Sequence, residues 1–405
     1  MSSQPSGLTR LDEFRRGWRG VVSLCVAALA VLLAGWGGWS WRQRANLERY
    51  QAECVERNAE QDWKGLAEVA KKWSDLEPTE AEPWLFRAAA AEGVKDWAGL
   101  VGLLDRVPRS SPKAVPALIR KAVAEFEPLN QPWDGLKTCD EVLRLEPKVL
   151  IAHKQAIFFC AMTMQRREMV RRIRAAIRER RESPESYVYL VGASWLNPGA
   201  AYRHNSRWLE REPDNETFLV ARAVRVYGSQ AKKDKERSAE FEHIPEAAQM
   251  LERFPRNLEL IAWFLNLAIT DGDVERVRSL LERVPDEERE RDTRVLRARS
   301  WLEDADGKPD EAEALLSKAL TIDPYWWQLH FQRHDLARRA GRAADAERFL
   351  EIYKCAKDAS VAIMTMNRTE TGFEDPVFLG SLSKLVDQVG DTEVSVALKE
   401  RLAAR

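Results

Sequence analysis

Two histidines stand at a spacing that can bind a metal ion. His330 and His334 are four residues apart, so on a helix both imidazoles would project from the same face. The residues between them are Phe331, Gln332 and Arg333, and the glutamate that acts as general base in an HExxH metalloprotease is therefore missing. We expect a structural role on the core side of a helix, with metal ligation by His330 and His334 as the alternative.

Other catalytic signatures are absent from the sequence. It holds no GxxxxGK phosphate loop, no GxGxxG after a strand, and no serine or cysteine in a nucleophile elbow. Five cysteines without a CxxC pair do not form a zinc site or a disulfide framework. We expect Cys54 and Cys139 to be small buried core residues. The sequence thus predicts a protein that is not an enzyme and needs no cofactor.

Arginines are concentrated between residues 166 and 181. Eight of them fall on one expected helix, opposite an apolar stripe of Met169, Ile173 and Ile177. A basic face of this kind can meet anionic lipid headgroups or an acidic partner. Because Glu168 and Glu179 are interspersed, we expect an ordinary solvated surface.

The elements that carry these residues repeat along the chain. Between Leu47 and Pro112 one pattern occurs twice, with each member shifted by 34 positions (84−50, 88−54, 97−63, 112−78). The first copy is Tyr50, Cys54, Trp63, Leu66, Ala70, Trp73 and Pro78, and the second is Trp84, Ala88, Trp97, Leu100, Leu104, Val107 and Pro112. A fixed period of this length is typical of stacked repeats in which no unit buries its own apolar face.

The spacing inside one copy predicts two helices. Trp84 and Ala88 share a face of the first helix, and Trp97, Leu100 and Leu104 form an apolar stripe on the second. A proline closes the second helix because it has no N–H to continue it. The same ending recurs at Leu76-Glu77-Pro78, Leu145-Glu146-Pro147, Arg211-Glu212-Pro213, Arg253-Phe254-Pro255 and Ile322-Asp323-Pro324.

At these residues the chain resembles the tetratricopeptide repeat family. The clearest late copy is Gly307, Ala312, Leu316, Ala319 and Pro324, and about nine hairpins fit between Leu47 and Asp358. The resemblance implies an all-α, right-handed superhelical solenoid without catalysis. The middle copies, from Pro147 to Pro255, depart from the pattern because they lack the glycine at the turn between helices.

The resemblance also implies a concave groove, lined by the first helix of each repeat, that receives a protein or peptide partner. Residues that follow core positions on these helices would face that groove. In the best-aligned copies they are Gln51, Leu85, Asn266, Phe331 and Asp335.

The overall charge favours protein over nucleic acid as a partner. The chain of 405 residues has a formal net charge of −1, of which residues 1–44 carry +4 and the rest −5. A mildly acidic solenoid lacks the basic stripe that nucleic-acid binding needs. Within it, residues 228–241 are charged and poor in apolar residues, so they predict a loop insertion or a helix extension.

The amino-terminal part predicts a membrane anchor. Residues 20–41 contain no charge, and at 1.5 Å per residue a helix of this length approaches the thickness of a bilayer core. We expect a short tail over 1–19, a single transmembrane helix over 20–41 flanked by tryptophans, a repeat solenoid over 45–358 and capping helices over 359–405. The alternative is a cleaved signal peptide.

The orientation of this anchor rests on few observations. Arginines flank the segment equally on both sides, but short amino-terminal tails usually stay in the cytoplasm, which favours a solenoid outside it. Ala30, Ala34 and Gly38 form a small-residue stripe that would allow a homodimer.

Three functions are consistent with these observations. The first is a membrane-anchored scaffold that binds a protein or peptide. The second is an assembly or quality-control factor of a bacterial-type envelope. The third is a metal-dependent enzyme or sensor that uses His330 and His334.

Overall fold

The chain folds into helices throughout the part that is described. The computed structural model describes residues 41–230, 247–365 and 370–403, and every regular element in these ranges is a helix. The all-α prediction is therefore confirmed. The chain divides into two compact units, Met1–Ala117 and Leu118–Arg405, and the single solenoid predicted for 45–358 spans both.

The first unit contains a helix over 41–59 followed by α2 (Trp63–Leu76), α3 (Glu82–Gly93) and α4 (Trp97–Leu104). Its core includes Cys54, Leu66 and Trp73, as the 34-residue pattern predicts. Gly93 lies against the ring of Trp63, and a Cβ there would approach a ring carbon to 2.2 Å. Gly93 therefore makes room for the neighbouring helix.

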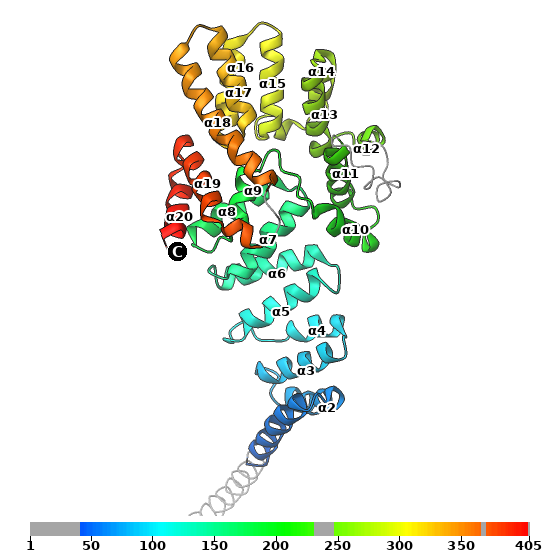
Figure 1. Ribbon diagram of the computed structural model, residues 1–405. Coiled ribbons are helices and arrows are strands. Elements are labelled where there is room, and N and C mark those ends of the chain that lie inside the picture. Colours follow the sequence, from blue (N-terminus) through cyan, green and yellow to red (C-terminus); the bar gives the residue numbers. More distant parts are fainter. Residues whose placement is uncertain (1–40, 231–246, 366–369, 404–405) are drawn as a thin grey trace, which may run out of the picture. The chain divides into compact units, whose positions relative to one another are not determined.

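Helix α5 begins in the first unit and ends in the second, and all later helices belong to the second unit. Figure 1 labels them in chain order. They are α5 (Ala114–Phe126), α6 (Pro132–Leu145), α7 (Leu150–Met162), α8 (Arg166–Arg178), α9 (Pro184–Val191), α10 (Ala201–Arg211), α11 (Glu216–Gln230), α12 (Ala247–Arg253), α13 (Leu258–Asp271), α14 (Val274–Glu282), α15 (Thr293–Ala305), α16 (Pro309–Ile322), α17 (Trp327–Arg339), α18 (Ala343–Thr365), α19 (Pro376–Val389) and α20 (Thr392–Ala403), with short 3-10 turns η2 (Asp286–Glu288) and η3 (Glu370–Glu374).

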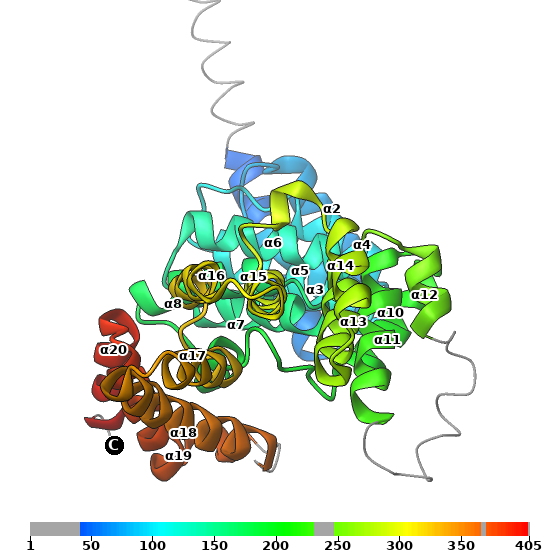
Figure 2. The ribbon, with the colours of Figure 1, turned by 90° about the horizontal axis from the view of Figure 1, so that it is seen from above.

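The prolines end helices where the sequence predicts. Helices α2, α6, α10, α12 and α16 each stop two residues before the closing proline. Within α16 the repeat residues Ala312, Leu316 and Ala319 are fully buried. Figure 2 shows the pairs α15 with α16 and α17 with α18 running side by side. The hairpin prediction is thus confirmed in its helix ends and in its core.

The turn inside most hairpins contains one residue with left-handed backbone. In the later hairpins it is glycine, at Gly272, Gly307, Gly341 and Gly390. In the earlier ones the place is taken by other residues, namely Gln61, Lys95, Asn130 and Met164, with φ between 50° and 60°. L residues rarely adopt this conformation. The turn therefore persists in the α7 and α8 hairpin, where the sequence lacks glycine.

A ring nitrogen bonds the closing proline in three repeats. The Nε1–H of Trp84 donates to the carbonyl of Pro78 at 3.0 Å, six residues earlier. The Nε2 atoms of His153 and His330 lie 2.8 Å from the carbonyls of Pro147 and Pro324, again six residues earlier. Each bond satisfies a carbonyl just beyond a helix end.

The connection between α9 and α10 breaks the regular plan. In the hairpins with a left-handed turn residue the two helices are separated by two to five residues, but residues 192–200 lie between α9 and α10. No left-handed residue occurs in this stretch. The irregular middle predicted from the sequence is therefore a long connection here, whereas most of the predicted insertion at 228–241 lies outside the described residues.

The carboxy-terminal helices return to the middle of the second unit. Helix α18 continues to Thr365, past the boundary predicted after Asp358, and Ala359, Ser360 and Ile363 are buried on the same helix. Asp375 caps α19 by accepting from the backbone N–H of Val377. Helix α20 lies beside α8 (Figure 1). The predicted cap thus covers an internal helix.

The predicted membrane span lies outside the described residues, except for Trp41. Across 41–230, 247–365 and 370–403, no helix combines the length and apolar character required to cross a bilayer. The anchor, its orientation and the small-residue stripe remain predictions, as does the handedness of the superhelix.

Candidate functional site

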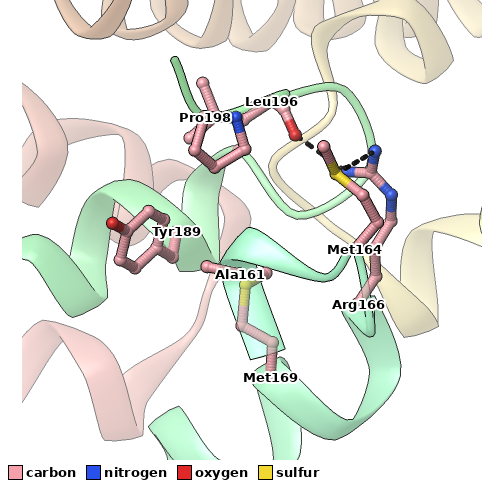
Figure 3. Close-up of a pocket in the computed structure, with 8 residues that line it drawn as sticks. Ala161, Met164, Arg166, Met169, Tyr189, Leu196 and Pro198 are labelled. Atoms are coloured by element: carbon pink, nitrogen blue, oxygen red, sulfur yellow. Dashed lines mark hydrogen bonds between the residues drawn. The ribbon is translucent and has the colours of Figure 1, made fainter. Parts of the chain in front are cut away.

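Arg166 fixes the long connection between α9 and α10. It is the first residue of α8, and its Nη1–H donates to the carbonyls of Ala193 and Leu196 at 2.8 and 3.0 Å. Its Nη2–H donates to Oδ1 of Asn197 at 2.8 Å. Figure 3 shows Arg166 reaching Leu196 beside Met164, around a cavity of about 10 Å³. That cavity holds one water at most, so the connection is packed against α8.

Arg166 also belongs to a buried network of four charges. Its Nε lies 3.0 Å from Oε2 of Glu259, in the first turn of α13. The same carboxylate accepts from Nη1 of Arg294 on α15 at 2.7 Å. Arg294 pairs in turn with Asp292, the N-cap of α15, at 2.8 Å. The network contains two positive and two negative charges and joins α8, α13 and α15.

Burial and pairing act in opposite directions on these carboxylates. Burial alone would raise the pKa of Glu259, but Arg166 and Arg294 hold it below its usual range. Burial would also raise the pKa of Asp292, but Arg294 and the backbone N–H groups that Asp292 caps hold it below its usual range. Both groups are therefore ionised at neutral pH, and the network is neutral overall.

One turn further along α15, Arg297 stands apart from this network. Its Nη1–H donates to Oδ1 of Asn266 on α13 at 3.2 Å, and its guanidinium lies 5.2 Å from the centre of the Trp326 ring. Burial lowers its pKa to about 10. Arg297 therefore stays protonated at neutral pH and bonds only neutral groups among the described residues.

These residues surround a pocket of about 260 Å³, here named the Arg297 pocket. Its walls come from α8, the 192–200 connection, α11, α13, α15 and the start of α17. They consist of Arg166, Ser194, Trp195, Asn197, Val224, Glu259, Ala262, Trp263, Leu265, Asn266, Ile269, Arg294, Arg297, Trp326 and Gln328. Aromatic walls with a few polar groups are typical of binding sites.

The predicted groove residues separate into different surroundings. Gln51 is exposed on the helix over 41–59 and Leu85 is half-buried on α3, both in the first unit. Asn266 lines the Arg297 pocket. Phe331 is 50% exposed on α17, with its ring 5.2 Å from that of Tyr353. Asp335 pairs with two arginines of its own helix. Only Asn266 of this set thus belongs to the pocket.

The two histidines each bond a different backbone carbonyl. His330 is buried, which lowers its pKa, and its Nε2 faces Pro324. Nδ1 of His334 lies 2.8 Å from the carbonyl of Ala346 on α18. No cluster of three potential metal-ligating side chains occurs among the described residues. Each imidazole therefore has one ring nitrogen bonded to a backbone carbonyl.

The arginine-rich face of α8 is largely occupied within the chain. Arg174 pairs with Asp391 and Glu393 at the start of α20, and Arg180 pairs with Glu400. Arg172 pairs with Asp140 of α6. The expectation of an ordinary solvated surface holds for the four arginines whose side chains stay more than half exposed, Arg167, Arg171, Arg178 and Arg180. It is wrong for Arg172 and Arg174, because α6 and α20 bring carboxylates against them. An open pocket of about 440 Å³ beside α6 and α7 retains Arg144 and Arg178 on its wall.

Comparisons with known proteins yield only distant likenesses. No protein-family model matches the chain, and no curated protein matches it in sequence. Among solved structures, PilW, a type IV pilus biogenesis factor, is 16% identical over 53% of this chain and 96% of its own, with a TM-score of 0.28. A tetratricopeptide repeat protein from Parabacteroides merdae is 12% identical over 60% and 93%, with a TM-score of 0.26.

Cut9, in the APC/C Cut9–Hcn1 complex, is similar over more of the chain. It is 12% identical over 88% of this chain and 79% of the other, with a TM-score of 0.32. At these scores the likenesses support no conclusion about function. The function proposed below therefore rests on the geometry of the chain itself.

The sequence alone could have identified Arg297 as a groove residue from its position in the repeat. Ala262, Arg297 and Phe331 each lie ten residues before the turn glycine of their hairpin, at Gly272, Gly307 and Gly341. Arg297 is thus equivalent to the predicted groove residue Phe331, one repeat earlier. In the same way Glu259 and Arg294 are 35 residues apart and carry opposite charges on adjacent helices. No such signal exists for Trp195, which lies in the irregular connection.

Proposed function

We propose that this protein is a non-catalytic scaffold that holds a segment of a partner protein in the Arg297 pocket. The pocket carries this proposal, because it joins aromatic walls with fixed polar groups on four helices. A volume of about 260 Å³ is slightly below the range of sites for drug-sized ligands, so it suits one or two side chains of a larger partner.

The rigidity of the site favours binding over catalysis. The buried network around Glu259 ties α8, α13 and α15 together, so the pocket walls are positioned before a partner arrives. A preorganised site loses less conformational entropy on binding. The titratable groups on its walls are held in ion pairs or in hydrogen bonds, which suits a structural platform.

We further propose that residues 20–41 anchor this scaffold in a membrane, with the repeats outside the cytoplasm. The basis is the uncharged length of the segment and its flanking tryptophans. A role in assembly or quality control within a bacterial-type envelope would follow from that placement. Alkaline carbonate extraction of the full chain checks the anchor, because a shortened soluble product would identify a signal peptide.

Site-specific crosslinking tests the scaffold function. A photoreactive amino acid replaces Asn266, which is exposed at the pocket, and a control chain carries it at Glu282, an exposed residue of α14. After irradiation of intact cells, we expect one adduct at position 266 that is absent at 282, with the crosslink mapping to a single segment of the partner. Equal adducts at both positions, or none, would refute binding at this site.

A further inference from the structure

The charges on the wall of the Arg297 pocket do not cancel. Arg166 and Arg294 are matched by Glu259 and Asp292, which leaves Arg297 bonded to the neutral side chains of Asn266 and Trp326. No carboxylate lies within ion-pair distance of Arg297 in the described part of the chain. The wall therefore retains one positive charge.

The buried carboxylate of Asp323 does not form an ion pair with Arg297. It lies behind Ser194, whose Oγ–H donates to its Oδ2, and its Oδ1 accepts from the backbone N–H of Tyr325. Its oxygens are thus directed to the 192–200 connection and to the cap of α17. Asp323 is not among the residues that line the pocket.

Hydrogen-bond donors on the wall also lack acceptors. The Nε–H of Arg297 and the indole N–H groups of Trp195 and Trp326 are buried without a partner among the described residues. An unsatisfied buried donor costs about 1–3 kcal/mol. The two asparagine amide oxygens on the wall are already used, by Arg297 and by Arg166. These three N–H groups have almost no accessible surface, whereas the Arg297 residue itself is partly exposed, so its positive charge is what the wall offers to a ligand.

One positive charge beside aromatic walls matches a carboxylate on an apolar stem. A carboxylate carries one charge and accepts up to four hydrogen bonds. Its methylene stem can lie on the indole rings of Trp195 and Trp263. A chain terminus carries the same carboxylate chemistry, and the experiment below distinguishes it from a side chain.

We propose that the Arg297 pocket binds the side-chain carboxylate of a Glu or Asp in the partner segment, beside an apolar residue that packs on the indoles. Arg297 supplies the charge and Asn266 orients the guanidinium. This inference rests on the proposed scaffold function and specifies the chemistry that the partner must carry.

Peptide selection on the full-length chain in detergent micelles tests the proposal. The probe is a degenerate library of nonapeptides with acetylated and amidated ends and a fixed central Glu. One sister library carries a central Gln, and a second carries Gln with a free carboxy terminus. Mass spectrometry measures how much of each library the immobilised protein retains. We expect retention of the Glu library to exceed that of the Gln library about tenfold.

Substitutions assign this preference to the pocket. Arg297→Gln should remove it and Arg297→Lys should restore it in part, since a lysine keeps the charge without the planar fork. Arg299→Gln is the matched control, because Arg299 lies on the same helix but pairs with Glu290 outside the pocket. Arg297→Gln leaves no carboxylate unpaired, so its helicity and melting temperature should match those of the unsubstituted chain.

The outcomes separate this inference from the scaffold function. Equal retention of Glu and Gln libraries, or a preference that survives Arg297→Gln, would overturn the carboxylate assignment. Preference for the library with a free terminus would overturn the side-chain source. In either case a specific adduct at position 266 would still support the scaffold. Failure of both experiments would reject both proposals.

Discussion

The hairpin of α15 and α16 and the stretch from α9 to α10 share one plan but differ in their connection. In the first, Asp306, Gly307 and Lys308 turn the chain with one left-handed residue, and Ala312, Leu316 and Ala319 fill the core. In the second, nine residues replace the tight turn and Arg166 holds them in place. The regular region builds a core, and the departure from regularity builds a pocket wall.

This difference shows where a repeat protein can acquire a specific site. A tight turn leaves no free backbone for binding, since its groups are used within the hairpin. The longer connection brings Ser194, Trp195 and Asn197 to the pocket, but it needs an arginine to satisfy its carbonyls. Stability of the irregular region should therefore depend on charge, and stability of the regular region on packing and backbone conformation.

The largest expected effect comes from Arg166. Replacing it by methionine removes donors from the carbonyls of Ala193 and Leu196 and leaves Glu259 with one cation. Loss of one partner from a buried pair typically costs about 3–5 kcal/mol. We expect a lower urea midpoint for the second unit and faster hydrogen exchange across 192–200. Arg171→Met serves as control, because Arg171 is mostly exposed and should cost under about 1 kcal/mol.

The next effect is a pH dependence of the free energy of unfolding, caused by Asp323. This residue follows α16 of the regular hairpin and accepts a hydrogen bond from Ser194 of the irregular 192–200 connection. Burial raises the pKa of Asp323 to about 6, although Ser194 and the backbone of Tyr325 stabilise its charged form. A carboxyl group whose folded-state pKa lies above its unfolded value binds a proton more tightly when folded. Between about pH 4 and 6 its contribution to stability therefore decreases as pH rises, by up to about 3 kcal/mol.

Asp323→Asn isolates this contribution, because the amide oxygen can accept from the backbone N–H of Tyr325 while the amide NH2 donates to Oγ of Ser194. Urea unfolding of the two chains, compared from pH 4 to 7, should show the unsubstituted chain losing stability relative to the variant as pH increases. Parallel profiles would mean that the pKa of Asp323 is not raised.

A smaller effect separates turn glycines from helix glycines in the regular region. Gly307 has φ of 78°, and a Cβ there would meet no atom within 4 Å. Gly307→Ala should therefore cost only the conformational energy, about 1–2 kcal/mol. Gly380 lies inside α19 with equally open space, so Gly380→Ala should stabilise by about 0.5–1 kcal/mol. Thermal unfolding of both variants should show shifts of opposite sign.

The smallest effect concerns the turns that lack glycine. Lys95 has φ of 60°, so Lys95→Gly relieves the left-handed strain and adds unfolded-state entropy. These terms nearly cancel, which predicts a gain of at most about 1 kcal/mol. Val94→Gly is the control, since Val94 has φ of −95° and should only lose stability. A loss at Lys95 equal to that at Val94 would argue against a strained turn.

The sequence by itself determined the helices and their packed faces. Closing prolines stop α2, α6, α10, α12 and α16 because proline ends a helix by its own covalent structure. Asp375 caps α19 through a bond to a residue two positions away. The buried stripe of Ala312, Leu316 and Ala319 follows from helical periodicity. Each of these results depends on residues within about one helical turn or one hairpin.

The candidate site was predicted only in part. Asn266, one of the predicted groove residues, lines the Arg297 pocket. Gln51 and Leu85 belong to the other compact unit, and Phe331 lies outside the pocket. The arginine run on α8 was interpreted as solvated surface, since its partners Asp391 and Glu393 are more than 200 residues away.

Tertiary structure alone decided which charges meet and which remain unpaired. Arg166 and Glu259 are 93 residues apart, and no periodicity of either helix brings them together. Their contact depends on the angle and offset at which successive helices pack, which many side chains determine jointly. The same packing leaves Arg297 without a carboxylate and places two indoles beside it. A pocket is a property of the space between helices, so its chemistry is fixed only when they have packed.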